Sequence, residues 1–222
     1  MTNLLEINNL SVDFPSRRGQ VAAVNKVSIA VAKGEVLGLV GESGAGKSTV
    51  GNSIINLLEP PGYISGGEII FDGNRIDQLS NEEMRKIRGA KIGTIFQDPQ
   101  TSLNPLMTIG KQLSETLIET LKISGASARE KSIELLDSVG IPNPEPRLDA
   151  YPHQFSGGMR QRVVIALALA GDPDLIIADE PTTALDVSIQ KQILDLIKSL
   201  CKQRNLGVII VTHDIGVIAE IA

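Results

Sequence analysis

The chain has 222 residues, 42% of them hydrophobic, and a formal net charge of −5. This length predicts one large domain, or one domain with a subdomain, and the acidic balance argues against a nucleic-acid-binding face, which needs clustered positive charge. A single cysteine, Cys201, excludes an internal disulfide and a zinc cluster built on cysteines.

The ends of the chain and its apolar runs bear on its location. The longest apolar run, residues 163–171, is far shorter than the roughly 20 residues that a helix needs to cross a bilayer. The first residues lack the basic and apolar segments of a signal peptide. We therefore expect a cytosolic chain that is soluble by itself, and its end inside an apolar pattern at Ala222 predicts that it belongs to something longer.

The first segments of the chain have the alternation typical of strands. Residues 4–12 and 20–32 alternate polar and apolar side chains, and a loop over 15–19 separates them. Residues 66–73 predict a further short strand, closed by a turn signal. We expect these strands to form a small antiparallel sheet.

Residues 36–40 predict a fully buried strand, and the stretch after it carries the strongest signal in the chain. It has the pattern G-x-x-x-x-G-K-[ST] of a phosphate-binding P-loop and consists of Gly41, Glu42, Ser43, Gly44, Ala45, Gly46, Lys47, Ser48 and Thr49. Its glycines let the backbone curl until the N–H groups point at a polyphosphate. Lys47 adds positive charge, Ser48 offers a hydroxyl to Mg²⁺, and the N-terminus of the following helix favours an anion. The apolar residues that mark this helix are Val50, Ile54, Leu57 and Leu58.

Residues 92–96 predict another buried strand, which ends at Gln97. The periodicity then changes to that of a helix, because apolar residues recur every four positions over 109–121. A capping box at 127–130 predicts the start of a second helix. We therefore interpret 98–155 as a helical insertion into an α/β core.

Strands and helices alternate again after the insertion. Helices are predicted over 158–170 and 187–201, and strands over 175–178 and 208–211. This alternation indicates a mostly parallel sheet. The predicted fold class is therefore α/β, a P-loop core with a mostly parallel sheet, a small antiparallel β-subdomain and an inserted helical subdomain. We expect a single domain over 1–222 with three parts, 1–97, 98–155 and 156–222.

Two acids, Asp179 and Glu180, directly follow the predicted strand 175–178. Acids at the carboxyl end of a parallel strand face the ligand crevice. Asp179 is placed to hold Mg²⁺, directly or through water, and Glu180 is placed to polarise a water for attack on a γ-phosphate. The alternative, an ordinary exposed strand end, is disfavoured by the P-loop upstream.

A second glycine-bearing turn, Ser156-Gly157-Gly158, opens a predicted helix that Ser156 is placed to cap. Because one nucleotide rarely needs two phosphate-binding turns, the residues alone leave a flexible helix entry as the alternative. His213 follows the last predicted strand, and by itself it is typical of a satisfied histidine at a strand end.

Together these motifs resemble an ABC-type ATPase, and the resemblance covers the whole chain. The segments that carry it are the P-loop, Gln97, Ser156-Gly157-Gly158, Asp179-Glu180, Ala184-Leu185-Asp186 and His213. In that family two domains pack head to tail, and each ATP lies between the P-loop of one subunit and the serine–glycine–glycine signature of the other. The second turn is thus implied to serve the nucleotide of a partner subunit. Phe155 and Met159 replace a leucine and a glutamine common in the signature, but the serine and glycines make the phosphate contacts.

The resemblance also implies a role for each site residue. The P-loop residues 43–49 bind phosphates, while Ser48, Gln97 and Asp179 hold Mg²⁺. Gln97 in addition reports the nucleotide state to the helical subdomain.

Glu180 is implied as the catalytic base and His213 as a contact to the γ-phosphate. The segment that ends at Asp186 is implied to contact the partner subunit near its ATP. The family also stacks an aromatic side chain on adenine, for which Phe14 is a candidate that fits the core equally well. Arg18 is the other candidate.

Three segments are most similar to importer ATPases for dipeptides and oligopeptides, namely 97–105, 151–162 and 181–188. Importers of nickel and of glutathione belong to the same branch and remain alternatives, and a non-transport ABC ATPase is a more distant one. The resemblance implies ATP and Mg²⁺ as cofactors, no nucleic acid, and as partners membrane permeases, a second ATP-binding subunit and, indirectly, an external substrate-binding protein. It also implies a peripheral location at the cytoplasmic face of the membrane and a C-terminal extension beyond this chain.

Overall fold

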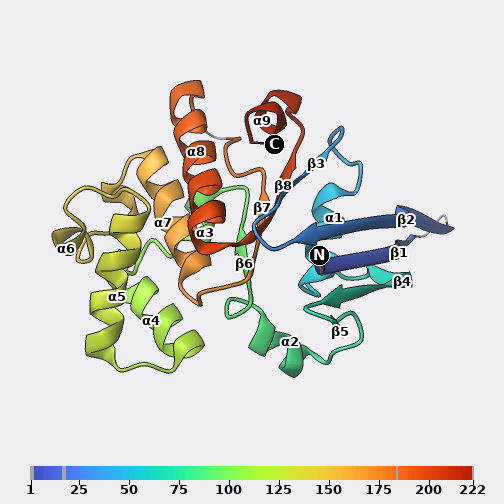
Figure 1. The fold of residues 1–222 in the computed structure, drawn as a ribbon, viewed down its shortest axis with the longest axis horizontal. Helices are drawn as coiled ribbons and strands as arrows, with labels where there is room; N and C mark the ends of the chain where they lie inside the picture. Colours follow the sequence, from blue (N-terminus) through green and yellow to red (C-terminus); the bar gives the residue numbers. More distant parts are fainter. Residues whose placement is uncertain (1–2, 17–18, 184, 222) are drawn as a thin grey trace.

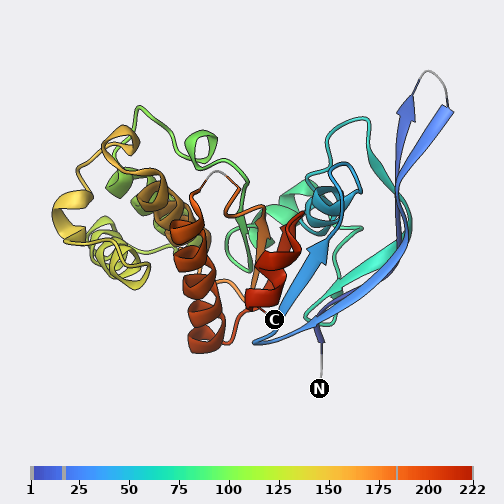
Figure 2. The same ribbon diagram turned by 90° about the horizontal axis from the view of Figure 1, so that it is seen from above.

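The computed structural model describes residues 3–16, 19–183 and 185–221, and it contains two four-stranded sheets. One sheet is antiparallel and lies at one end of the molecule, and the helical insertion lies at the opposite end (Figure 1). The parallel sheet lies between them, and the same arrangement is visible from above (Figure 2). The site is therefore expected where the central, parallel sheet ends.

The antiparallel sheet has the strand order β2-β1-β4-β5. Its strands are β1 (Asn3–Ser16), β2 (Gly19–Ala32), β4 (Tyr63–Phe71) and β5 (Asn74–Arg75). Ile7 of β1 pairs with Ile29 of β2 on one side and with Ile69 of β4 on the other, so apolar side chains of three strands share one face. The predicted sheet is confirmed. The loop between β1 and β2 is shorter than the predicted 15–19, because β1 continues to Ser16.

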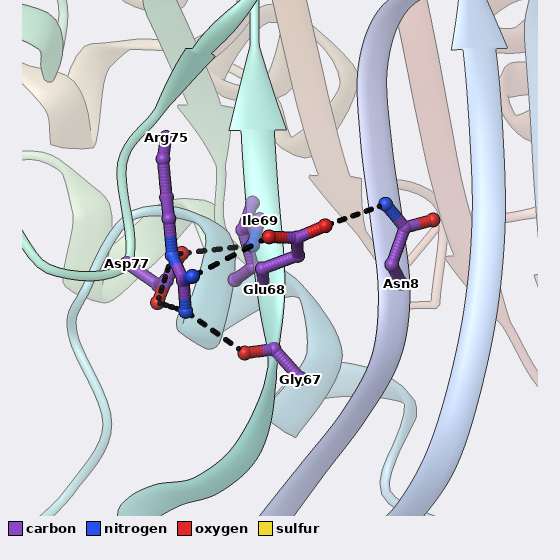
Figure 3. A network of polar contacts seen from close by, with 6 residues as sticks. All are labelled: Asn8, Gly67, Glu68, Ile69, Arg75 and Asp77. Atoms are coloured by element: carbon purple, nitrogen blue, oxygen red, sulfur yellow. Dashed lines mark hydrogen bonds and ion pairs between the residues drawn. The ribbon is translucent and has the colours of Figure 1, made fainter.

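A polar network closes this sheet where β4 turns into β5 (Figure 3). Arg75 Nη2 donates to Asp77 Oδ2 at 3.0 Å, and Arg75 Nη1 lies 3.4 Å from Glu68 Oε2. Asp77 Oδ1 accepts from the backbone N–H of Ile69 at 2.9 Å, and the Asp77 side chain is 5% exposed. Asn8 of β1 donates to Glu68 at 3.1 Å. Hydrogen bonds of this network therefore connect the segment after β5 to β4 and β1.

The second sheet is parallel throughout the described residues and has the order β3-β8-β7-β6. Its strands are β3 (Val36–Val40), β6 (Ile92–Ile95), β7 (Leu175–Asp179) and β8 (Gly207–Thr212). β8 is buried along its whole length because it lies between two strands, whereas β3 is partly buried and Val40 is 41% exposed. The predicted full burial of 36–40 is therefore wrong, since the side chains of this edge strand are covered only in part.

Helices flank the parallel sheet and build the insertion. They are α1 (Lys47–Ile54), α2 (Asn81–Ile87), α3 (Pro99–Ser102), α4 (Ile109–Leu121), α5 (Gly125–Ser138), α6 (Pro144–Arg147), the 3₁₀ turn η1 (Pro152–Gln154), α7 (Gly157–Leu169), α8 (Val187–Arg204) and α9 (Ile215–Ile221). The insertion predicted over 98–155 contains α3 to α6. Among the described residues, none of the helices combines the length and apolarity that crossing a bilayer requires.

Several helix boundaries differ from the prediction: α8 continues to Arg204, three residues past its expected end, and α1 and α5 differ for identifiable local reasons. α1 ends before Asn56, which adopts a left-handed φ of 51°, so Leu57 lies outside the helix and is 45% exposed. α5 begins one turn earlier than expected, because the hydroxyl of Ser124 accepts from the N–H of Ser127 at 3.3 Å. The capping residue of α5 is therefore Ser124 and not Ser127.

Alternate side chains of β7 and β8 enter two separate apolar cores. Ile176 and Ile210 belong to the core formed with α7, α8 and the insertion. Ile177 and Ile209 belong to the core shared with α1 and the antiparallel sheet. Since successive strand residues point to opposite faces, one central sheet holds both ends of the molecule in place.

Candidate active site

The parallel strands end at one edge of their sheet, because they all run in the same direction. The register pairs Val40 with Thr212 and Asp179 with Val211, so the last residues of three strands are level. The segments that follow therefore emerge side by side, namely the P-loop after β3, Gln97 after β6, Glu180 after β7 and His213 after β8.

The P-loop closes around its own lysine. Lys47 Nζ donates to the carbonyl oxygens of Gly41 and Glu42, both at 2.7 Å, which holds the ammonium at the loop. Gly46 has a left-handed φ of 82°, and a Cβ there would collide with the carbonyl oxygen of Ala23. Glycine at this position lets α1 start directly at the loop. The loop thus brings backbone N–H groups, the positive end of α1 and a lysine charge to one place.

Glu180 is the most heavily hydrogen-bonded side chain of the site. Its Oε2 accepts from Gln97 Nε2 at 2.7 Å and from Thr183 Oγ1 at 2.8 Å. Its Oε1 lies 2.9 Å from His213 Nδ1, which must carry the proton because a carboxylate can only accept. Burial raises the pKa of the Glu180 carboxyl, but the hydrogen bonds from His213 and Thr183 outweigh this and leave the pKa below its ordinary value. Glu180 is therefore a carboxylate at neutral pH.

Asp179 has the properties of a cation ligand. Its Oδ1 is buried and has no hydrogen-bond partner among the described residues. Burial raises the pKa of the Asp179 carboxyl, an effect that the hydroxyl of Ser48 partly offsets and the negative charge of Glu180 strengthens. Mg²⁺ prefers such oxygen ligands and would supply the missing positive charge. Asp179 and Ser48 therefore fit a magnesium site, and Gln97, which lines the same cavity as Ser48, has an amide oxygen of the same ligand type.

A polar cavity that opens to solvent joins most of these residues. Its lining includes Ala23, Glu42, Ser43, Gly44, Gly46, Lys47, Ser48, Thr49, Gln97, Glu180, Thr183 and His213. The P-loop side of the cavity offers N–H groups and a lysine, which suit a polyphosphate. The same lining offers the carboxylate of Glu180, which suits a general base for an attacking water.

The glycine-bearing signature turn lies outside the described lining of this cavity. Ser156 caps α7, as predicted, by accepting a hydrogen bond from the helix backbone at 3.3 Å. A Cβ on Gly158 would come within 2.8 Å of the Ile189 side chain in α8. Asp186 in turn caps α8, accepting from the N–H of Ile189 at 2.9 Å. The start of α7 and the start of α8 therefore form a second cluster, with Ser156, Gly157, Gly158 and Asp186.

The two candidates for adenine stacking have different positions. Phe14 is partly buried and packs against the core of the antiparallel sheet, where a Cβ on Gly62 would come within 2.5 Å of its ring. The described cavity lining does not include Phe14, so a stacking role for it stays a prediction. Arg18 lies outside the described residues, as does Ala184 of the segment that precedes Asp186.

Two cavity-lining residues, Ala23 and Thr183, have no role in the sequence prediction. Ala23 belongs to β2 and reaches the P-loop through tertiary packing, for which the local sequence holds no signal. Thr183 does have a signal, since it lies three residues after Glu180 with Pro181 between them, a spacing typical of a turn.

Known proteins resemble this chain along its whole length. The ABC transporter family model matches residues 24–183. The oligopeptide transport ATP-binding protein OppD of Bacillus subtilis (strain 168) is 53% identical over 100% of this chain, which covers 62% of that protein. The dipeptide transport ATP-binding protein DppD of the same strain is 51% identical over 100% of this chain, which covers 67% of it. The chain thus spans less than two thirds of the length of the first of these relatives.

Solved structures are similar as well. A dimeric post-hydrolysis state of the ATP-binding cassette MJ0796, bound to ADP and Pi, has a TM-score of 0.85 and 33% identity, over 97% of this chain and 90% of that one. A second dimeric structure of MJ0796, described as a bacterial ABC transporter cassette, has a TM-score of 0.84 and 34% identity over the same shares. The predicted fold class, a P-loop core with a parallel sheet, an antiparallel sheet and helices, is confirmed by this similarity.

Proposed function

The chain belongs to the ABC transporter family, and we propose that it is the ATP-hydrolysing subunit of an importer in the dipeptide and oligopeptide branch. In this function it binds ATP, closes against a second ATP-binding domain and hydrolyses the nucleotide to drive import. The similarity to the two peptide transport proteins of Bacillus subtilis supports the branch. Nickel and glutathione are the alternative substrates within it.

The observation that carries the proposal is the convergence of a P-loop lysine, a buried unpaired acid and a hydrogen-bonded acid on one edge of the sheet. Lys47 and the loop N–H groups bind the phosphates of ATP. Asp179, Ser48 and Gln97 hold Mg²⁺, which when bound neutralises phosphate charge. Glu180, ionised at neutral pH, orients the attacking water and accepts its proton. His213 orients Glu180 and contacts the γ-phosphate.

Closure needs two copies or two homologous domains. The second cluster offers Ser156, Gly157 and Gly158 at the N-terminus of α7, yet the cavity lining described above does not include them. A helix N-terminus with a free glycine turn suits an anion, so this cluster is complementary to the phosphates in the cavity of a partner. ATP then favours the closed pair because it binds that state better, and hydrolysis lets the domains part.

The link to transport is proposed through the segment after Gln97. Gln97 reaches the site, while apolar side chains before and after it in the chain face solvent, Phe96 at 47% exposure and Leu106 at 86%. We assign this surface to the membrane permeases, which places the chain at the cytoplasmic face of the membrane as a peripheral subunit. The permeases and an external binding protein would determine which peptide is transported.

The proposal is tested by ATP hydrolysis in the full-length protein, with wild type compared to Glu180→Gln and Lys47→Ala. Glu180→Gln should bind ATP normally and lose turnover by about 10²–10⁴-fold, the usual contribution of a general base. Lys47→Ala should raise the dissociation constant for ATP, measured by calorimetry, about tenfold or more, since it removes a charged hydrogen-bond donor. Undiminished turnover in Glu180→Gln would exclude Glu180 as the base, and normal affinity in Lys47→Ala would contradict the P-loop site.

A further inference from the structure

Three donors hold the carboxylate of Glu180, and they come from different parts of the chain. Gln97 follows β6 and His213 follows β8, so each reaches Glu180 across the sheet edge. Thr183 lies in the turn that Glu180 itself begins. Two of the three donors share one oxygen, Oε2, at 2.7 Å from Gln97 and 2.8 Å from Thr183.

Gln97 has a competing partner in the proposed function, which this inference rests on. Gln97 turns to Mg²⁺ when the nucleotide is bound, whereas His213 keeps Nδ1 on Oε1 of Glu180 and contacts the γ-phosphate through its other ring nitrogen. Thr183 is not among the residues proposed to hold Mg²⁺ or the γ-phosphate, and the turn that begins at Glu180 places its hydroxyl beside the Glu180 carboxylate. When Gln97 leaves Oε2, Thr183 stays as the donor on that oxygen.

The backbone fixes the position of Thr183. Glu180 has a left-handed φ of 46°, and its N–H donates to the carbonyl of Val211 at 2.8 Å, so β8 holds the start of the turn. The N–H of Thr183 donates to the carbonyl of Glu180 at 3.3 Å. Pro181 and Thr182 are buried between them. A strained backbone that persists because its surroundings hold it is typical of active sites.

We propose that Thr183 is a positioning residue for hydrolysis, whose hydroxyl holds Oε2 of Glu180 and thereby fixes the plane of the carboxylate against the attacking water. The terminal torsion of a glutamate is soft, so a carboxylate with a single donor rotates freely over a broad range. Misplacement of a reacting group by about 1 Å costs roughly 10²-fold in rate. The threonine hydroxyl removes this freedom during the step in which Gln97 is engaged elsewhere.

The Thr183 side chain is exposed to the cavity and not part of a core. Thr183→Val keeps the shape of the side chain and removes the hydroxyl, so the fold should be preserved. Thr183→Ser keeps the hydroxyl and should restore the rate. A matched control is Thr120→Val in α4, which removes a hydroxyl that donates to the carbonyl of Thr116 at 2.7 Å, far from the site in sequence and fold.

The experiment measures ATP turnover, ATP affinity and thermal unfolding in the full-length protein for wild type and these three variants. Thr183→Val should lower kcat by about 10- to 100-fold while KM changes by less than about twofold, because the lost contact acts on the base and not on ATP binding. Thr183→Ser and Thr120→Val should hydrolyse ATP within about threefold of wild type. Added to Glu180→Gln, Thr183→Val should lower the residual single-turnover rate no further, because it acts through Glu180.

Full turnover by Thr183→Val would overturn the positioning role and leave the proposed function intact. A loss that Thr183→Ser does not restore, or an additional loss in the Glu180→Gln background, would also overturn it. Absence of turnover in wild type would instead overturn the proposed function, and the role of Thr183 with it.

Discussion

Asp174 lies just before β7 and between two lysines. Its carboxylate is 3.1 Å from Lys33 Nζ and 3.4 Å from Lys91 Nζ, and its side chain is 31% exposed. Burial raises the pKa of this carboxyl, but the two lysines, Lys33 first, outweigh it and leave the pKa below its ordinary value. Because the folded pKa is depressed, the ion pairs stabilise the fold above the unfolded pKa and lose this contribution as the pH falls through the folded one.

Asp174→Asn should therefore destabilise the fold in a pH-dependent way. The loss in the free energy of unfolding at pH 7 should be about 0.5–1 kcal/mol, the range for partly exposed pairs. The difference from wild type should shrink below about pH 4, the ordinary pKa of an aspartate, and vanish once the folded carboxyl is protonated. Thermal unfolding from pH 7 to pH 2 measures this.

A control for this prediction is Asp172→Asn, since Asp172 is 78% exposed and its nearest cation, Arg204, is 3.8 Å away. The control should differ little from wild type at any pH. A constant difference between Asp174→Asn and wild type across the pH range would mean that charge is not the cause.

Residues whose type is required by the ligand could be identified from the sequence. Lys47 and Asp179 belong to short motifs whose residue types are required by the ligand, and the structure places them at the same sheet edge as expected. Ala23 could not be predicted, because its carbonyl reaches Gly46 through the packing of β2 on the P-loop. The pairing of Gln97 with Glu180 also depends on which strands are neighbours, which local patterns do not encode.

At the scale of elements, one buried acid holds the segment after β5 against β4 (Figure 3). Asp77 accepts from the N–H of Ile69 at 2.9 Å and from Arg75 at 3.0 Å while only 5% exposed. Asp77→Asn keeps the shape but loses the charge and leaves one partner without an acceptor. The free energy of unfolding should fall by about 1–3 kcal/mol, as measured by urea denaturation.

Glu68→Gln is the matched control for Asp77→Asn. Glu68 belongs to the same network, but its side chain is 36% exposed and Arg75 is 3.4 Å away. Glu68→Gln should therefore lower the free energy of unfolding by less than about 1 kcal/mol. If both variants unfold at the same urea concentration, the burial of Asp77 does not make its contact with β4 more stabilising than the exposed contact of Glu68.

Helices with a long apolar periodicity could be predicted from the sequence, but the residues at which they begin and end were predicted less accurately. The four-residue spacing correctly identified α4, whose residues Ile109, Leu113 and Leu117 are buried. The short helix α2 was missed, although Ser80 and Glu83 form a capping box, because its seven residues bury one side chain, Met84, and show no periodicity. The edge position of β3 depends on the strand order, which no single segment determines.

At the scale of the whole molecule, the structure separates two places that both suit phosphate. The cavity holds the P-loop and the acids, while the cluster at the start of α7 and α8 lies outside its described lining. The central sheet fixes both, because its two faces belong to the two cores. From the residues alone, a flexible helix entry stays the alternative for Ser156, whereas the proposed head-to-tail pair would give this turn a phosphate ligand.

This arrangement predicts a change of mass with ATP. Glu180→Gln is expected to bind ATP without hydrolysing it, so two copies should stay together around the trapped nucleotide. Light scattering of Glu180→Gln should show a doubling of mass when Mg-ATP is added and the monomer mass without it. Adding Ser156→Arg should abolish the doubling, because a bulky side chain at the N-terminus of α7 blocks the contact to the nucleotide of the partner, while calorimetry should still detect ATP in the intact P-loop cavity. A monomer that demonstrably holds ATP in Glu180→Gln would contradict a pair of identical copies and favour a homologous second ATP-binding subunit, which would then restore the doubling when mixed with this chain.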